Sequence, residues 1–197
     1  MLASNARLIP PSCPPNCTFT ISNAEKPWTY PHNFDYIHGR MLFSCFLSPP
    51  TVFASAFSSL TPGGYFEMQE IGFRVRSNDG SLSGTALEAW NSKVIDGAAK
   101  LGKDWDCTPN YKRWFEEAGF VDVVEKVFYW PGNPWVKGEK GKKIGSCMLA
   151  NALQGLSAAS LAIFTRVFGM SVEEVEESLE AVRRDLRDSS IHAYYPL

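Results

Sequence analysis

The residues of this 197-residue sequence that are best suited to chemistry follow short runs of strand-forming residues. His38 closes the apolar run Phe34–His38, and Arg40 comes two residues later. A histidine ring exchanges a proton near neutral pH, and a guanidinium group can orient a carboxylate or a phenolate. We therefore predict a catalytic role for His38. One alternative stays open, in which His38 is a structural residue that bonds a backbone carbonyl.

Two carboxylates lie in the strand predicted over Tyr65–Ile71. Side chains alternate along a strand, so Glu67 and Glu70 point to opposite faces. A carboxylate in a buried strand needs a partner. Either these groups pair with Arg40 or Arg74, or one of them lies in a cleft with a raised pKa and acts as a base. Glu70 is the second catalytic candidate, and Glu67 is a candidate for a substrate pocket.

A candidate binding corner follows the first predicted strand at Asn23, Ala24 and Trp28. The Asn23 amide presents an acceptor and donors to the edge of a heterocycle, next to the Ala24 backbone N–H, and Trp28 supplies an aromatic wall. Such a corner suits an adenine. The alternative is an Asx-turn, in which the Asn23 side chain closes the end of the strand.

Aromatic residues gather in two further stretches, Phe128–Trp135 and Leu161–Met170. Trp130, Trp135 and Phe164 could wall an apolar substrate pocket together with Glu67. The alternative for these side chains is ordinary core packing.

Hydrophobic periodicity predicts the elements that must position these residues. Strand patterns alternate with helical patterns, which is typical of an α/β protein with a mostly parallel sheet, and ligands bind beyond the carboxyl ends of such strands. The predicted strands are Thr18–Ile21, Phe34–Ile37, Tyr65–Ile71 and Val121–Phe128, and the predicted helices are Leu87–Leu101, Asn110–Ala118, Ile144–Phe168 and Val172–Arg187.

Short local signals mark some element boundaries. Ser171 and Glu174 have the spacing of a capping box, Gly119 is placed to end a helix, and Thr61–Gly64 has the composition of a turn. No linker or repeat divides the chain, so we expect a single domain over residues 1–197.

Composition excludes several classes of protein. The net charge is -2, from 19 Lys+Arg and 21 Asp+Glu, which argues against nucleic acid as the main ligand. The five cysteines and three histidines lack metal-site spacing, so we predict no metal. The most apolar stretch, Ala158–Phe164, is too short for a membrane span, and residues 1–17 lack the features of a signal peptide. We expect a cytoplasmic protein, with the nucleus as the alternative.

Several phrases of the sequence resemble one known family. They include FDYIHGR at 34–40, LTPGGYFEMQE at 60–70, SNDGSL at 77–82 and EEAGFVDVVEKVFYWPGNPW at 116–135, and they occur in the family's order. The chain resembles the fungal LaeA-like class I S-adenosylmethionine-dependent methyltransferases of secondary metabolism. The resemblance implies a partial Rossmann-like methyltransferase sheet with flanking helices.

The resemblance also assigns roles to the candidate residues. It places the donor's adenine at Asn23 and Ala24, His38 and Arg40 next to the donor, and Glu70 near the methyl acceptor. The family's glycine-rich E/D-x-G-x-G loop does not occur in these 197 residues. We therefore expect that the donor-binding half and the last strand of the family's sheet are missing, and that this chain binds S-adenosylmethionine weakly or not at all.

Three functions follow from these expectations. The first is methyl transfer to a hydroxyl or carboxyl group of a small molecule, in which His38 or Glu70 acts as the base. The second is a donor-independent cyclase or pericyclase on a methyltransferase-derived scaffold. The third is a non-catalytic subunit completed by a partner or by a second copy, since an incomplete sheet favours a homodimer. A gene fragment without a function of its own is the remaining alternative.

Overall fold

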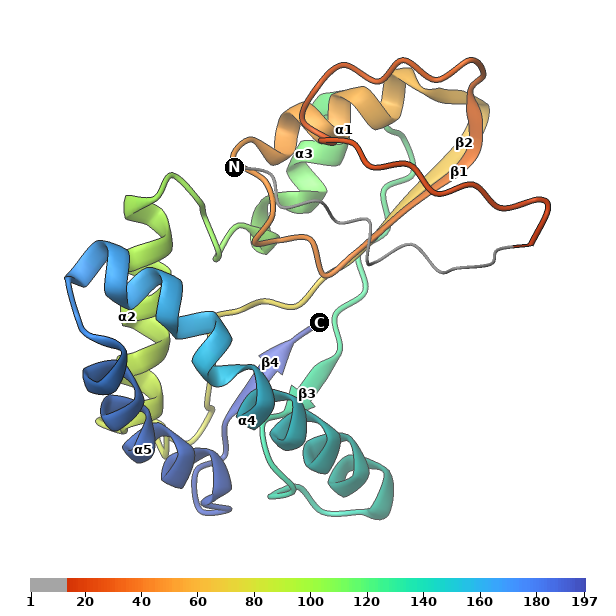
Figure 1. The fold of residues 1–197 in the computed structure, drawn as a ribbon. Coiled ribbons are helices and arrows are strands. Elements are labelled where there is room, and N and C mark those ends of the chain that lie inside the picture. The colour runs from red at the N-terminus through yellow and green to blue at the C-terminus, as the bar shows by residue number, and fades with distance from the viewer. Residues whose placement is uncertain (1–13) are drawn as a thin grey trace.

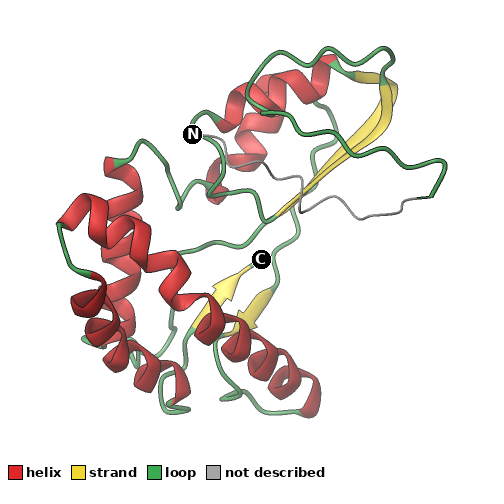
Figure 2. Ribbon diagram, in the orientation of Figure 1, coloured by secondary structure: helices red, strands yellow, loops and turns green. Residues whose placement is uncertain are grey.

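The computed structural model describes residues 14–197 (Figure 1). Figure 2 shows that the molecule has two parts, each built from helices and strands. Each part contains one two-stranded sheet. In chain order the elements are β1 (Phe34–Arg40), α1 (Pro49–Ser58), β2 (Leu60–Gln69), α2 (Ala86–Lys100), a short 3-10 helix (Thr108–Asn110), α3 (Tyr111–Ala118), β3 (Tyr129–Pro131), α4 (Glu139–Phe168), α5 (Val172–Arg187) and β4 (Tyr194–Pro196).

The first part is a strand-helix-strand unit made of β1, α1 and β2. The two strands pair in parallel, with Ile37 opposite Phe66, which confirms the strands predicted at 34–37 and 65–71. The predicted turn at Thr61–Gly64 is wrong, because these residues belong to β2 and accompany a shift in register near its start. Pro49 and Pro50 begin α1, where the N–H that proline lacks would have no partner within the helix.

A cluster of aromatic rings holds this part together. Phe53 on α1 is fully buried. Its ring lies 5.4 Å from that of Phe66 on β2 and 4.7 Å from that of Phe115 on α3, both in edge-on geometry. Edge-on pairs of this kind add to the energy of burial. The cluster therefore fixes β2 between α1 and α3.

The second part is a bundle of α2, α4 and α5, shown at the lower left of Figure 1. Val94, Leu179 and Phe164 lie in its core, and at most 2% of each side chain is exposed. Both bonds of the predicted capping box are present at Ser171 and Glu174. The helices predicted at 87–101, 144–168 and 172–187 are therefore confirmed.

Helix α3 ends where the sequence predicts it. Gly119 has a φ of 106°, in the left-handed region, and its N–H bonds the carbonyl of Glu116 over 3.1 Å. Phe120 bonds the carbonyl of Phe115 over 3.1 Å. Since a side chain at this φ would be strained, glycine suits the position that ends the helix.

The strand predicted at Val121–Phe128 is wrong. Among the described residues, this segment pairs only at its end, where Phe128 and Leu197 exchange two backbone hydrogen bonds. The observed strand β3 begins at Tyr129 and pairs antiparallel with β4. Val121 and Val124 remain 83% and 76% exposed.

The strand predicted at Thr18–Ile21 is also wrong. These four residues are exposed and form no ladder with any described residue. Phe19 and Ile21 are 46% and 60% exposed. A β-branched sequence becomes a strand only when another strand accepts its backbone bonds, and this segment has no such partner between residues 14 and 197.

Helix α4 is longer than predicted, because it begins at Glu139 rather than Ile144. It contains an 18-residue window with a mean hydropathy of 1.5, of which 22% is buried. By length and composition alone, α4 is long and apolar enough to cross a membrane. The expectation that every apolar stretch is too short is therefore wrong. Core helices pass the same test, and α4 packs against α2 and α5, so this property does not show a span.

The fold is a partial α/β arrangement with flanking helices, as the sequence predicts. Between residues 14 and 197, β1 pairs only with β2, and β3 pairs with β4. The backbone of β4 also bonds Gly72 and Arg76, so the chain that follows β2 lies beside the second strand pair. The carboxyl ends of β1 and β2 therefore face the junction between the two parts.

Candidate functional site

The outer face of the β1 and β2 pair carries most of the predicted site. Register places His38 opposite Glu67, and Arg40 opposite Gln69. All four side chains are exposed. The structure therefore brings the catalytic candidate His38 together with Arg40 and Glu67 on one surface at the carboxyl ends of two parallel strands.

Glu67 is held by its neighbours on this face. Its two carboxylate oxygens accept hydrogen bonds from the Tyr36 hydroxyl and from Gln69 Nε2, the latter over 2.9 Å. The bond from Tyr36 is the largest of the effects that lower the pKa of Glu67. The same bond raises the pKa of Tyr36. Glu67 is therefore an anion, and each of its two oxygens already accepts a hydrogen bond.

Glu70 points to the opposite face and is 9% exposed. Its carboxylate accepts the backbone N–H of Leu42 at 2.8 and 3.0 Å and that of Phe43 at 3.2 Å. Burial raises the pKa of Glu70, and these backbone bonds partly oppose the shift. Neither of its predicted partners, Arg40 and Arg74, forms an ion pair with Glu70. Arg74 instead pairs with Asp106 over 2.6 Å.

Glu70 is one of the groups that hold the loop 41–45 directly after β1. Lys103 donates to the carbonyls of Ser44 and Cys45 over 2.9 and 3.3 Å. Met41 has a φ of 53°, which is strained for a residue with a side chain. Strain of this kind persists only where the surroundings fix the backbone. The sequence does not predict this loop, because its backbone groups are bonded by side chains that are distant in the sequence.

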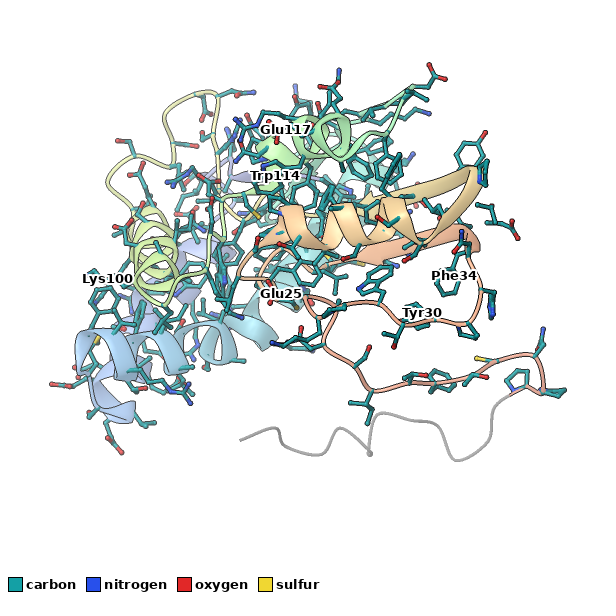
Figure 3. All side chains as sticks on the ribbon, turned by 90° about the horizontal axis from the view of Figure 1, so that it is seen from above. Glu25, Tyr30, Phe34, Lys100, Trp114 and Glu117 are labelled. Atoms are coloured by element: carbon teal, nitrogen blue, oxygen red, sulfur yellow. The ribbon has the colours of Figure 1, made fainter. Side chains whose placement is uncertain are left out.

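The predicted adenine corner forms a turn. Asn23 Oδ1 accepts the N–H of Glu25 over 2.9 Å, which is the Asx-turn alternative. Trp28 Nε1 donates to the carbonyl of Ala24 over 2.8 Å. Glu25 lies beside α1 (Figure 3) and accepts the N–H groups of Leu47 and Ser48 through Oε1. The corner is thus ordered by its own bonds, and it packs against the start of α1.

Aromatic rings attach this corner to β1. Tyr30 contacts Trp28 and Phe34 edge-on, at 5.8 and 5.0 Å between ring centroids, and Figure 3 shows Tyr30 and Phe34 near the start of the strand. Trp28 also lines a shallow hollow of about 280 Å³ with hydroxyl-bearing residues of α1, among them Thr51 and Ser55. Trp28 therefore lies beside α1, and its role as an aromatic wall for a ligand stays a prediction.

The other predicted pocket residues lie in different parts of the molecule. Phe164 is 2% exposed in the helical core, which is the core-packing alternative. Trp130 belongs to β3, and Trp135 Nε1 donates to the carbonyl of Ala193 over 2.9 Å. Glu67 stays on the outer face of β2. Its predicted grouping with these three aromatic residues is not what the structure shows.

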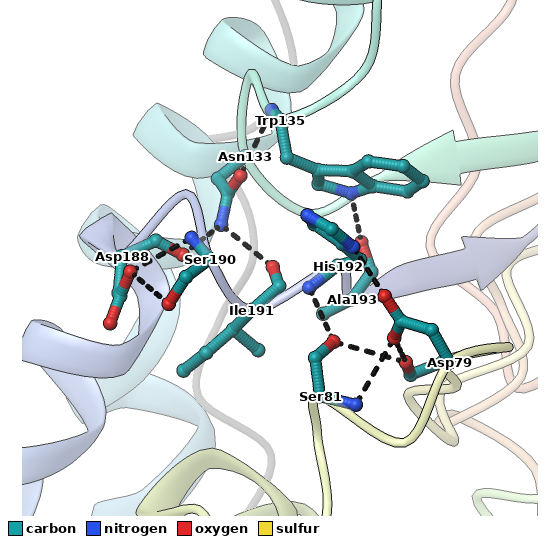
Figure 4. A network of polar contacts seen from close by, with 10 residues as sticks. Asp79, Ser81, Asn133, Trp135, Asp188, Ser190, Ile191, His192 and Ala193 are labelled. Carbon is teal, nitrogen blue, oxygen red and sulfur yellow. Dashed lines mark hydrogen bonds and ion pairs between the residues drawn. The ribbon is translucent and has the colours of Figure 1, made fainter.

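A polar network near the C-terminus was not predicted (Figure 4). His192 Nδ1 contacts the Asp79 carboxylate, and its ring stacks on Trp135 with 4.6 Å between centroids. Asp79 also accepts hydrogen bonds from Ser77 and Ser81, which hold its pKa well below the usual range. The network joins a turn that follows β2 to the segment that enters β4.

The thiol of Cys107 offers no reactive centre. Cys107 is fully buried, and burial raises the pKa of its thiol to about 11. A thiol with a raised pKa is a poor nucleophile at neutral pH. No group of three or more His, Cys, Asp or Glu side chains between residues 14 and 197 is arranged to hold a metal ion.

A parallel strand-helix-strand unit with polar groups at its carboxyl end is typical of the Rossmann-like α/β class. Comparison with known proteins identifies which member. A methyltransferase domain family matches residues 5–125. Together with the relatives described next, this match shows that the chain belongs to the LaeA-like class I methyltransferases of fungal secondary metabolism.

Three relatives illustrate the family. The chain is 38% identical over 89% of its length to the probable methyltransferase tdiE of Emericella nidulans. It is 31% identical over 94% to the methyltransferase pytC of Aspergillus terreus, and 29% identical over 96% to the protein-methionine methyltransferase laeA of Emericella nidulans. These matches cover 56%, 58% and 51% of the respective relatives, so the chain spans about half their length.

Proposed function

We propose that this chain takes part in methyl transfer from S-adenosylmethionine to an oxygen atom of a small secondary metabolite. The observation that carries the proposal is the exposed pair His38 and Arg40 at the carboxyl end of β1, in a chain 38% identical to a methyltransferase. Ligands of open α/β sheets bind at this edge.

Oxygen methylation needs a positioned acceptor and a group that takes its proton. The sulfonium donor supplies the methyl group. His38 is the base in our proposal, because its ring is exposed on the outer face and stacks on Tyr36. Glu70 has a different role, because its oxygens already accept hydrogen bonds from two backbone N–H groups. It positions the loop that follows His38 and Arg40.

The corner at Asn23 fits one end of the donor. Asn23 Oδ1 is engaged by Glu25, whereas Asn23 Nδ2 makes no hydrogen bond with the described residues and can donate to a ring nitrogen of adenine. Trp28 is half-buried, with its N–H turned to Ala24, and provides a ring face beside this corner. Asn23, Ala24 and Trp28 would hold the adenine.

The proposed role of His38 can be tested in the organism that makes the metabolite. Deletion of the gene should remove a methylated product from the metabolite profile measured by mass spectrometry. The unaltered gene should restore that product, and His38→Ala should not. The matched control is His32→Ala, because His32 is also exposed but lies before β1. Restoration by His38→Ala at a normal protein level would contradict the proposal.

The purified 197-residue chain should bind S-adenosylmethionine far more weakly than a full-length relative. The reason is that backbone contacts of a glycine-rich loop contribute strongly to binding such a donor, and no E/D-x-G-x-G sequence occurs here. Calorimetric titration measures this directly. A micromolar dissociation constant would overturn the expectation, and in that case Asn23→Ala should weaken the binding if adenine lies at this corner.

A further inference from the structure

The outer face of the β1 and β2 pair lacks aliphatic side chains. Facing positions of the two strands form three cross-strand rows on this face, because partners in a parallel ladder point the same way. The rows are Tyr36 with Tyr65, His38 with Glu67, and Arg40 with Gln69. A sheet face that packs against a helix is usually rich in Val, Ile and Leu. This face instead offers aromatic rings, a cation and hydrogen-bonding groups.

No carboxylate between residues 14 and 197 forms an ion pair with Arg40. Glu67 has both oxygens engaged by Tyr36 and Gln69. Glu70 points to the other face, where it holds backbone N–H groups. The exposed side chain of Arg40 makes no hydrogen bond or ion pair with any residue between 14 and 197. Its guanidinium therefore remains able to bind an anion at the ligand-binding edge of the sheet.

Two rings adjoin this cation on β1. The Tyr36 and His38 rings are stacked, with 6.1 Å between centroids and 28° between planes. Tyr36 is 53% exposed, and Tyr65 beside it is 75% exposed. Alternate residues of a strand lie about 6.6 Å apart, so the rings and the guanidinium form one continuous row. Such a row can contact a flat aromatic ring and the acidic group attached to it.

We propose that this face binds an aromatic acid, with the acid's carboxylate on Arg40 and its ring against Tyr36 and His38. In the reaction proposed above, this compound is the methyl acceptor. Its role as acceptor rests on that proposed function, whereas its binding does not. Arg40 then selects the substrate, and His38 lies next to it.

The probe for this site is 4-hydroxybenzoate, and 4-hydroxybenzamide is its uncharged counterpart. Titration of the isotope-labelled chain, followed by amide shifts in nuclear magnetic resonance spectra, should show benzoate binding that perturbs β1 and β2. Arg40→Gln should weaken that binding tenfold or more. Arg184→Gln should leave it unchanged, because Arg184 is an exposed arginine on α5, outside this face. The benzamide should bind the unaltered chain and Arg40→Gln equally weakly.

Two results would overturn the proposal. One is equal benzoate affinity in the unaltered chain and Arg40→Gln. The other is binding of L-methionine through Arg40 without binding of the benzoate, which would assign Arg40 to the amino-acid end of the donor. Either result leaves the test of His38 in the organism unaffected. Failure of this proposal is therefore distinguishable from failure of the proposed function.

Discussion

Replacing Asn133 with alanine should lower the free energy of unfolding by about 2–4 kcal/mol, because the loss of a buried hydrogen-bonding group leaves its partners without those hydrogen bonds. Asn133 is 2% exposed. Its Nδ2 donates to the carbonyls of Asp188 and Ile191 over 3.0 and 3.3 Å, and its Oδ1 accepts the N–H of Trp135 over 3.1 Å. Urea unfolding monitored by tryptophan fluorescence measures the change.

The control for this substitution is Asn151→Ala on α4. Asn151 is exposed, and no hydrogen bond joins its side chain to another described residue. Alanine also favours a helix more than asparagine does, so the control should be neutral or slightly stabilising. If Asn133→Ala changed stability no more than the control does, the three bonds of Asn133 would not hold this end of the molecule together.

Replacing Glu70 with alanine should cost about 2–4 kcal/mol of stability, because it leaves two backbone donors without an acceptor. The donors are the N–H groups of Leu42 and Phe43, within the loop where Met41 has a φ of 53°. Glu70→Gln should cost less, because its amide oxygen can still accept the N–H of Leu42. Hydrogen exchange should show lost protection at residues 42 and 43 in Glu70→Ala and partial protection in Glu70→Gln.

The same pair of variants gives a pH dependence. Burial raises the pKa of Glu70 in the folded chain above its value in the unfolded chain. A group of this kind contributes stability that is fully present below its unfolded pKa and is lost as the pH rises through its folded pKa. The stability of the unaltered chain relative to Glu70→Gln should therefore fall as the pH rises through that range. A constant difference would contradict the burial of the carboxylate.

Helices were the most predictable part of this fold, because their signals are local. The Ser171 and Glu174 capping box and the left-handed Gly119 each depend on a few neighbouring residues. The strands at 18–21 and 121–128 were mispredicted for the opposite reason. Their residue types favour strands, but a strand also needs a partner, and residue types do not report whether one is present.

In the candidate site, too, local features could be predicted, whereas contacts with distant residues could not. The sequence identified His38 and Arg40 as neighbours, and their face follows from strand alternation alone. It also gave the Asx-turn of Asn23 as an alternative. The partners of Glu70 could not be predicted, because they are backbone N–H groups of a loop 27 and 28 residues away. Sequence patterns place side chains well but do not show where distant main-chain groups lie.

The network around His192 has a consequence for the order in which the chain folds. Its bonds to Ser81 and Asp79 span 111 and 113 residues, and the bond from Tyr194 to Asn78 spans 116. Contacts so distant in sequence form late, because a long loop must close first. During synthesis the turn at 77–81 leaves the ribosome long before its partners. In the nascent protein, the turn therefore lacks these hydrogen bonds until the residues after 190 have emerged.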